Sequence, residues 1–213
     1  METKQTQFWK GSFGRKYSER SSFADVEDFN QRHEKRFGVT RDDLYSDWLG
    51  DFPRSMRILE VGCNLGFQIR SIGRAGFSNL FGIDVQEHCL QGTKELEPIV
   101  RMAGGSALQI PFADGSFDLV YSHHVLIHFA RNDLPLVMDE MERVSKAYIM
   151  GIEYYAPEFT NVDYRGNTDF LWKADYSKMF LDRFPDLALQ RMQQHKYRDG
   201  SGNIDIAYLM GKP

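Results

Sequence analysis

One stretch decides the fold: Ile58-Leu59-Glu60-Val61-Gly62-Cys63-Asn64-Leu65-Gly66. It starts as a short apolar run, typical of a buried strand, and ends in a loop with a glycine at either end. An amphipathic segment typical of a helix follows and extends to about Arg74. Strand, glycine loop and helix in this order indicate the first βα unit of a parallel sheet, and the glycines allow a ligand to approach the backbone closely.

The same alternation continues along the chain. Further apolar runs, which we interpret as strands, lie near residues 80–83, 99–102, 117–121 and 147–152. Helical segments are expected between these strands, and such repetition predicts a parallel sheet covered on both faces. After a helix expected at about residues 169–184, the runs 187–195 and 204–210 read as two antiparallel strands joined by a turn-rich loop.

The N-terminal part of the chain has a different character. Residues 1–53 are polar and aromatic, with short amphipathic helices expected at 23–37 and 42–49. We predict that residues 1–53 form a helical cap or lid on a single compact domain of residues 54–213. The predicted fold class is α/β: a Rossmann-like, doubly wound, mostly parallel seven-stranded sheet with an antiparallel C-terminal hairpin.

Composition excludes several classes of protein. The chain of 213 residues has 30 acidic and 26 basic side chains, so its net charge of −4 disfavours nucleic-acid binding. Its two cysteines, Cys63 and Cys89, exclude a disulfide framework and a cysteine-rich zinc site. No apolar run approaches the roughly 18 residues of a membrane span. We expect a cytoplasmic protein without a membrane partner, and the sequence leaves its oligomeric state open.

A carboxylate ends the second predicted strand. Asp84 follows an apolar run, at the place where a carboxylate accepts hydrogen bonds from ribose hydroxyls in nucleotide-binding sheets. A dinucleotide fingerprint would need glycines at positions 62, 64 and 67, but the chain has Asn64 and Phe67 there. The missing glycines weaken an interpretation as an NAD-dependent oxidoreductase, which stays open as an alternative, while the spacing of Asp84 from the glycine loop favours a ribose contact over a simple helix cap.

Three motifs together carry a family resemblance. Glu60-x-Gly62-x-x-x-Gly66, Asp84, and the run 105–112 followed by 114–120 resemble the class I S-adenosylmethionine-dependent methyltransferases of the type 11-like group. The resemblance implies S-adenosyl-L-methionine as the cofactor. The cofactor contacts that it implies are Glu60, Gly62, Cys63, Asn64, Gly66, Asp84, Val85, Ser106, Ala107, Leu108 and His123. Ser106 stands where the family often has an aspartate, so the adenine contact differs there.

Three histidines follow the fourth predicted strand: His123, His124 and His128. They lie at the carboxyl edge of the sheet, where open α/β sheets bind ligands. We predict no metal, because no cysteine or clustered carboxylate completes a ligand set. His124 or His128 is a candidate general base or acceptor-orienting group, since imidazole exchanges protons at cellular pH. A packing or capping role is the alternative for each.

The N-terminal stretch Phe8–Arg20 is rich in aromatic residues and is expected to be either a lid over the cofactor or a hydrophobic staple. With the later segments 164–166 and 171–176, it is similar to a small group of methylases associated with pseudaminic acid biosynthesis. Candidate substrate-binding residues are Tyr17, Glu153, Tyr154 and Arg165.

The resemblance implies transfer of a methyl group to an oxygen or nitrogen of a small polar acceptor. Nonulosonic-acid or surface-sugar biosynthesis is the context that it implies. Two alternatives stay open beside it: a protein or RNA methyltransferase, and a noncatalytic module that binds an adenosine cofactor.

Overall fold

The computed structural model describes residues 2–23, 25–90 and 100–213. The helices are α1 (Lys4–Lys10), α2 (Ser12–Arg20), α3 (Val26–Phe37), α4 (Arg41–Leu49), α5 (Phe67–Arg74), α7 (Leu134–Val144) and α8 (Tyr176–Arg183), with a 3-10 turn η1 (Leu126–His128). The strands are β1 (Arg57–Val61), β2 (Asn79–Asp84), β3 (Val100–Gly104), β4 (Phe117–His123), β5 (Ser145–Tyr154), β6 (Thr160–Asn161), β7 (Trp172–Lys173), β8 (Ala188–Lys196) and β9 (Ile204–Gly211).

Seven of these strands form the main sheet, in the order β3-β2-β1-β4-β5-β9-β8. The first five are parallel to one another, and β9 is antiparallel to both β5 and β8. The predicted sheet and its C-terminal hairpin are therefore confirmed. The strand order reverses between β1 and β4, and the carboxyl ends of strands at such a reversal leave a crevice for a ligand.

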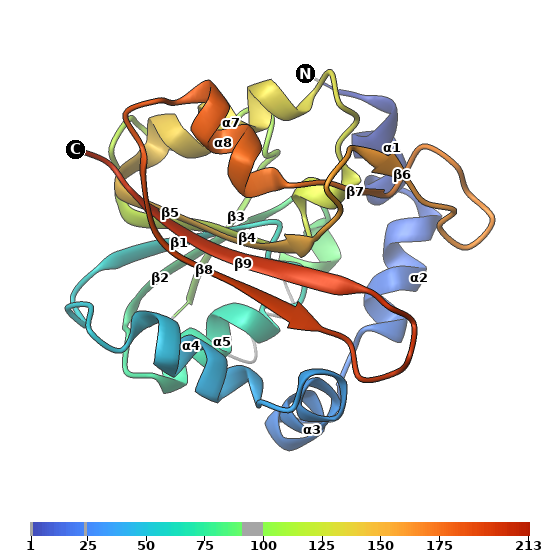
Figure 1. The fold of residues 1–213 in the computed structure, drawn as a ribbon, viewed down its shortest axis with the longest axis horizontal. Helices are drawn as coiled ribbons and strands as arrows, with labels where there is room; N and C mark the ends of the chain where they lie inside the picture. The colour runs from blue at the N-terminus through green and yellow to red at the C-terminus, as the bar shows by residue number, and fades with distance from the viewer. Residues whose placement is uncertain (1, 24, 91–99) are drawn as a thin grey trace.

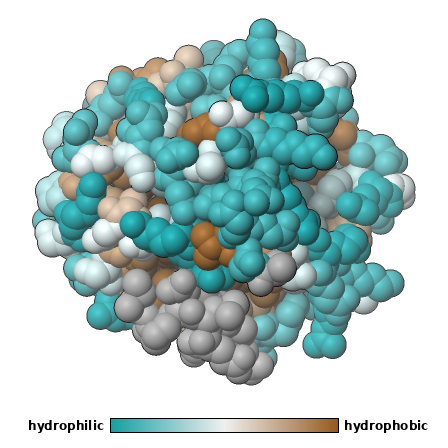
Figure 2. Space-filling model, turned by 90° about the horizontal axis from the view of Figure 1, so that it is seen from below, coloured by the Kyte–Doolittle hydropathy of each residue, from teal (hydrophilic) through white to brown (hydrophobic). Residues whose placement is uncertain are grey.

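Helices cover both faces of the sheet (Figure 1). Helix α7 buries one apolar stripe on one face, while α4 and α5 pack their apolar side chains on the other. Seen from the side of α3, α4 and α5, the surface is mostly hydrophilic, with hydrophobic residues in small separate patches (Figure 2). No helix within the described residues combines the length and apolar character needed to cross a bilayer.

The N-terminal region is more helical than the sequence indicated. Helices α3 and α4 match the two expected amphipathic segments, but α1 and α2 were not predicted as helices. Thr3 caps α1 by accepting a hydrogen bond from the Thr6 amide at 3.2 Å. Helices α1 and α2 stand at one end of the sheet in Figure 1, so the aromatic N-terminal stretch lies over the strand ends.

One helix boundary was predicted wrongly. Helix α8 begins at Tyr176, not near residue 169, because Trp172 and Lys173 pair with Asn161 and Thr160 as strands β7 and β6. The Asp175 side chain then caps α8 by accepting a hydrogen bond from the amide of Lys178. The third strand begins at Val100, and residue 99 of its predicted range lies outside the described residues.

Candidate active site

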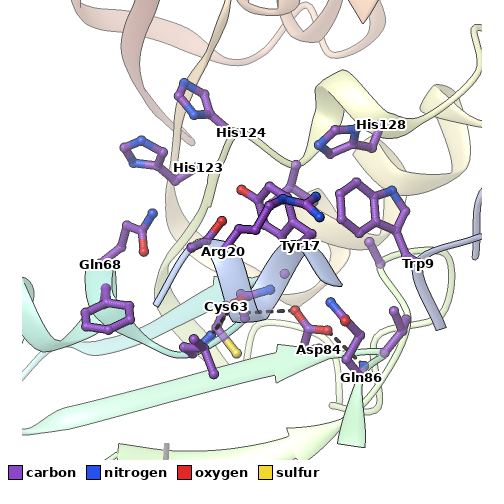
Figure 3. A pocket seen from close by; sticks show the side chains of 18 of the residues that line it. Trp9, Tyr17, Arg20, Cys63, Gln68, Asp84, Gln86, His123, His124 and His128 are labelled. Carbon is purple, nitrogen blue, oxygen red and sulfur yellow. Dashed lines mark hydrogen bonds between the residues drawn. The ribbon is translucent and has the colours of Figure 1, made fainter. Parts of the chain in front are cut away.

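A cavity of about 380 Å³ opens where the carboxyl ends of β1, β2 and β4 meet the N-terminal helices. One side of it consists of the loops after β1 and β2, and helices α1 to α3 form the opposite side. In Figure 3, Tyr17 and Arg20 of α2 lie between Asp84 and the histidines that follow β4. The sequence motifs and the aromatic N-terminal stretch therefore face the same space.

The glycine loop has a backbone that other residues adopt with difficulty. Gly62 has a φ of +70°, and a Cβ atom at this position would lie 2.7 Å from a methyl carbon of Val125. The amides of Gly62 and Cys63 both donate to the carbonyl of Ile83, at 2.8 and 3.0 Å. Glycine at position 62 thus lets the loop fold tightly between β2 and the segment after β4.

Asp84 faces the cavity although its side chain is only 6% exposed. One carboxylate oxygen accepts a hydrogen bond from the Asn64 amide and the other from the Gln86 amide, both at 2.8 Å. Burial raises the pKa of Asp84, and the two amides oppose that rise. Each oxygen keeps lone-pair capacity for a further donor, so the carboxylate can receive a pair of ribose hydroxyls.

Most of the predicted cofactor residues line the cavity. They are Gly62, Cys63, Asn64, Asp84, Val85, Ser106, Ala107 and His123. Glu60, Gly66 and Leu108 lie outside this lining, so their contact with the cofactor stays a prediction. Glu60 and Leu108 are buried in the protein interior, and burial raises the pKa of Glu60 to about 8. Gly66 instead caps the start of α5 with a φ of +73°.

His123 is held in place from the other side of the cavity. The Arg41 guanidinium donates to its ring, and the Tyr45 hydroxyl lies 3.0 Å from its Nδ1 atom. Burial first, and then the charge of Arg41, lower the pKa of His123 well below the usual value. The ring is therefore neutral at physiological pH and serves as an acceptor for the arginine.

His124 is paired with a carboxylate from the distant hairpin. Its Nε2 atom donates to Asp205 Oδ2 at 2.8 Å, and the Tyr197 hydroxyl donates to Asp205 Oδ1 at 3.1 Å. Because the Nε2–H group points at Asp205, Nδ1 is the ring atom left to accept a proton from a substrate. His124 also has a φ of +54°, a conformation that non-glycine residues adopt mainly at turns and functional sites. A base oriented by a buried carboxylate fits proton abstraction from an acceptor.

His128 has a different environment at the other end of the cavity, beside Trp9 (Figure 3). Its Nδ1 atom donates to the carbonyl of Phe170 at 2.9 Å, and its ring centroid lies 4.4 Å from that of Trp9. Burial lowers the pKa of His128 to about 4. Such a ring binds a proton weakly at neutral pH, so His124 is the better placed base. Among the described residues, no group of three or more His, Cys, Asp or Glu side chains is arranged to hold a metal.

The four candidate substrate residues separate in the structure. Tyr17 lines the cavity, and Tyr154 packs its ring 4.6 Å from that of His124 without being part of the lining. Substrate contact by Glu153 is corrected, because its fully buried carboxylate accepts from the Ser122 hydroxyl and from the amides of Val125 and Leu126. It braces the loop after β4. Arg165 is also corrected, since it lies exposed and outside the cavity lining.

Sequence reasoning missed two residues of the site, Arg41 and Asp205. Asp205 stands between two isoleucines in β9, and a single carboxylate in an otherwise apolar strand is a signal that could have found it. Arg41 is the first residue of α4, and its partner His123 lies far along the chain. No local pattern marks that contact.

Comparisons with known proteins agree with this geometry. Residues 59–148 match the family described as a methyltransferase domain. The chain is 32% identical over 104 residues to 24-methylenesterol C-methyltransferase 2 of Arabidopsis thaliana, which is 46% of this chain and 28% of that protein. It is also 32% identical over 92 residues to malonyl-[acyl-carrier protein] O-methyltransferase of Erwinia pyrifoliae, 43% of this chain and 34% of that protein. The chain thus spans about a third of the length of these relatives.

Among solved structures, the magnesium protoporphyrin IX methyltransferase of Synechocystis PCC 6803 with bound S-adenosylmethionine shares the fold. It superposes with a TM-score of 0.70 at 13% identity, over 100% of this chain and 99% of that one. The superposition shows that the two proteins share a fold, and the family match covers the part of the chain that runs from β1 into β5.

Proposed function

We propose that this protein is an S-adenosylmethionine-dependent methyltransferase that modifies an oxygen or nitrogen of a small polar acceptor. One observation carries the proposal: the same cavity has the glycine loop and Asp84 on one side and His124, bonded to the buried Asp205, on the other. A cofactor held by the first group faces an acceptor activated by the second.

The residues of this chain have separate tasks in such a reaction. The bound cofactor supplies an electrophilic methyl group on a sulfonium. Asp84 accepts hydrogen bonds from the ribose hydroxyls, and the loop at Gly62 holds the amino acid part against the strand ends. Residues 1–53 act as a cap on the single domain of residues 54–213, and α1 and α2 exclude water from the cavity.

His124 removes the proton of the acceptor. Its Nδ1 atom would accept a hydrogen bond from the acceptor hydroxyl or amine and would take up the proton that this group loses on methylation. Asp205 keeps the proton on Nε2 and stabilises the imidazolium that forms. Tyr197 in turn holds the other oxygen of Asp205, so the base is oriented before the acceptor binds.

Two features of the sequence support the proposed class of acceptor: the net charge and the aromatic N-terminal motif. A net charge of −4 provides no overall field for a phosphate backbone, which favours a small molecule over RNA. The N-terminal aromatic motif resembles methylases associated with pseudaminic acid biosynthesis, and it motivates our proposal of a nonulosonic or surface-sugar acceptor.

Calorimetric titration with S-adenosylmethionine and S-adenosylhomocysteine tests the cofactor site. We expect micromolar binding by the wild-type chain and binding at least about 100-fold weaker in Asp84→Ala, because two charge-assisted hydrogen bonds are lost. Asp51→Ala removes an exposed carboxylate far from the cavity lining and is the matched control. Failure of the folded wild-type chain to bind either compound contradicts the proposal.

Turnover is then measured as release of S-adenosylhomocysteine with sugars and nucleotide sugars as acceptors. A methylated sugar supports the proposed acceptor class, whereas methylation of a protein or RNA alone assigns the enzyme to another class. Tight cofactor binding without turnover on sugars, proteins or RNA identifies a noncatalytic binding module.

A further inference from the structure

Positive charge is concentrated in the cavity of an acidic protein. Four arginines of the N-terminal helices belong to its lining: Arg20, Arg32, Arg36 and Arg41. Asp84 is the one carboxylate among the described lining residues, and its oxygens already accept two backbone amides. The whole chain carries a net charge of −4, so this local excess of cations is a property of the cavity and not of the surface in general.

Arg41 is the buried member of this set. Its side chain is 8% exposed, and burial lowers its pKa. It donates to His123, which is neutral, and its Nε atom has no hydrogen-bond partner among the described residues. No ion pair joins it to a carboxylate within the described parts of the chain. The buried carboxylate of Asp205 acts on Arg41 from a distance and opposes that lowering. Since a buried donor without a partner is costly, the open Nε–H group suits a direct contact with an anion.

Arg36 is a second cation without a carboxylate partner among the described residues. Its guanidinium lies 5.2 Å from the ring centroid of Tyr197, the residue that holds Asp205 behind His124. Its charge also acts on Arg41. One turn earlier in α3, Arg32 forms an ion pair with Asp28 at 2.8 Å, so its charge is already compensated. Arg20 also has no ion pair among the described residues, but it lies over the ring of Phe13, 5.9 Å from the centroid. Arg36 and Arg41 are therefore the two arginines at the His124 end of the cavity.

We propose that the methyl acceptor carries a carboxylate or phosphate group, which binds Arg36 and Arg41 and places the reacting atom beside His124. This inference rests on the proposed methyltransferase function and names its substrate class. A guanidinium binds either anion through paired N–H donors. The sulfonium of the bound cofactor adds positive charge to the same cavity, which further favours an anionic acceptor over a neutral one.

The test uses three probes of one shape: glucose, glucuronate and glucose 6-phosphate. The full-length chain, loaded with S-adenosylhomocysteine, is titrated with each probe. We expect at least one anionic probe to bind at least about 10-fold more tightly than glucose, and the comparison of the two anions shows whether carboxylate or phosphate is preferred.

Two variants locate the binding group. Arg36→Gln is expected to weaken binding of the preferred anion about 10- to 100-fold and to leave the affinity for S-adenosylhomocysteine unchanged. Lys35→Gln makes the same change of charge on the neighbouring residue of α3, which is exposed and outside the cavity lining, and should have no effect. Arg41→Lys keeps the buried charge but removes the paired N–H donors of the guanidinium, so it should also weaken the binding of the anion.

Three results would overturn the inference. The first is that neither anion binds more tightly than glucose. The second is that Arg36→Gln and Lys35→Gln change the affinity for the anion equally. The third is that Arg36→Gln weakens the binding of S-adenosylhomocysteine as much as it weakens the binding of the anion. The last result would assign the arginines to the carboxylate of the cofactor. A wild-type chain that fails to bind S-adenosylhomocysteine contradicts the proposed function instead, and titration of the free chain with the same probes still tests the arginines.

Discussion

The two sides of the cavity are built in different ways. The cofactor side comes from two neighbouring loops, in which the amides of Asn64 and Gln86 hold Asp84. The acceptor side joins Arg41 from the N-terminal helices, His124 after β4 and Asp205 from β9. One side is local in the sequence and consists largely of backbone, while the other is assembled by tertiary packing from side chains.

The fold of the sheet requires the loops on the cofactor side but does not require the side chains on the acceptor side. The turns after β1 and β2 follow from the parallel sheet itself, and Gly62 is required by the close approach of Val125. Helices α2 to α4 and the hairpin carry the side chains of the other side, and these can change without altering the sheet. On this basis we expect cofactor binding to respond to backbone changes and catalysis to respond to side-chain changes.

The largest effect should come from His124. We expect His124→Ala to lower kcat about 10²- to 10⁴-fold, because a positioned base contributes that much to proton transfer, while the affinity for S-adenosylhomocysteine stays unchanged. His128→Ala should lower kcat far less, since the ring has a pKa of about 4 and is bonded to the Phe170 carbonyl. Steady-state kinetics with the identified acceptor measures both variants.

Asp205→Asn sharpens the same comparison. The asparagine keeps the size of the side chain but not the charge that stabilises the imidazolium, so kcat should fall and its pH profile should shift, with no change in cofactor affinity. Equal losses of kcat in His124→Ala and His128→Ala, or a loss of cofactor binding in Asp205→Asn, would contradict the division of the cavity into two sides.

A smaller effect is expected from the backbone of the cofactor side. Gly62→Ala places a methyl group 2.7 Å from Val125 at a φ of +70°, so we expect about 10-fold weaker binding of S-adenosylhomocysteine by calorimetry. Gly115→Ala is the matched control, because Gly115 has a φ of +60° but nothing within 4 Å of the added methyl. Equal affinities in the two variants would show that backbone strain at Gly62 does not shape the site.

The smallest effect on activity should come from Glu60, whose role we place in stability. Its pKa of about 8 in the folded chain lies above the usual value of 4.5, so the folded state keeps a proton that the unfolded state loses. This contribution to stability is complete below pH 4.5 and is lost as the pH rises through 8, by up to about 1.4 kcal/mol per pH unit.

Glu60→Gln should flatten this decline. Urea unfolding of the wild type and the variant at several pH values between 5 and 8 measures the difference, and the exposed Glu158→Gln is the control. Glu153 also contributes to the loss of stability of the wild type with rising pH, because burial raises its pKa to about 7. The difference in stability between the wild type and Glu60→Gln therefore isolates the contribution of Glu60. Parallel pH dependences would show that Glu60 is not protonated in the folded state.

The sequence predicted the sheet well and the helices near the termini less well. Short apolar runs that alternate with amphipathic segments mark a parallel sheet, because both faces of each strand are covered. The same reasoning placed the start of α8 too early, since the pairing of Trp172 with Asn161 depends on residues outside the helix. Helices α1 and α2 were missed because the residues that they bury are small or polar and form no apolar stripe: Gln5, Thr6, Gly14 and Ser18.

By itself, the sequence determined the fold class and the position of the glycine loop and Asp84 beside the cavity, because short strands that end in such loops follow from the local backbone. Only the tertiary structure decided that Glu153 braces a loop, that His124 is paired with Asp205, and that Arg41 is buried against His123. These properties depend on which side chains meet across distant elements and on how far water is excluded, and local patterns of residues record neither.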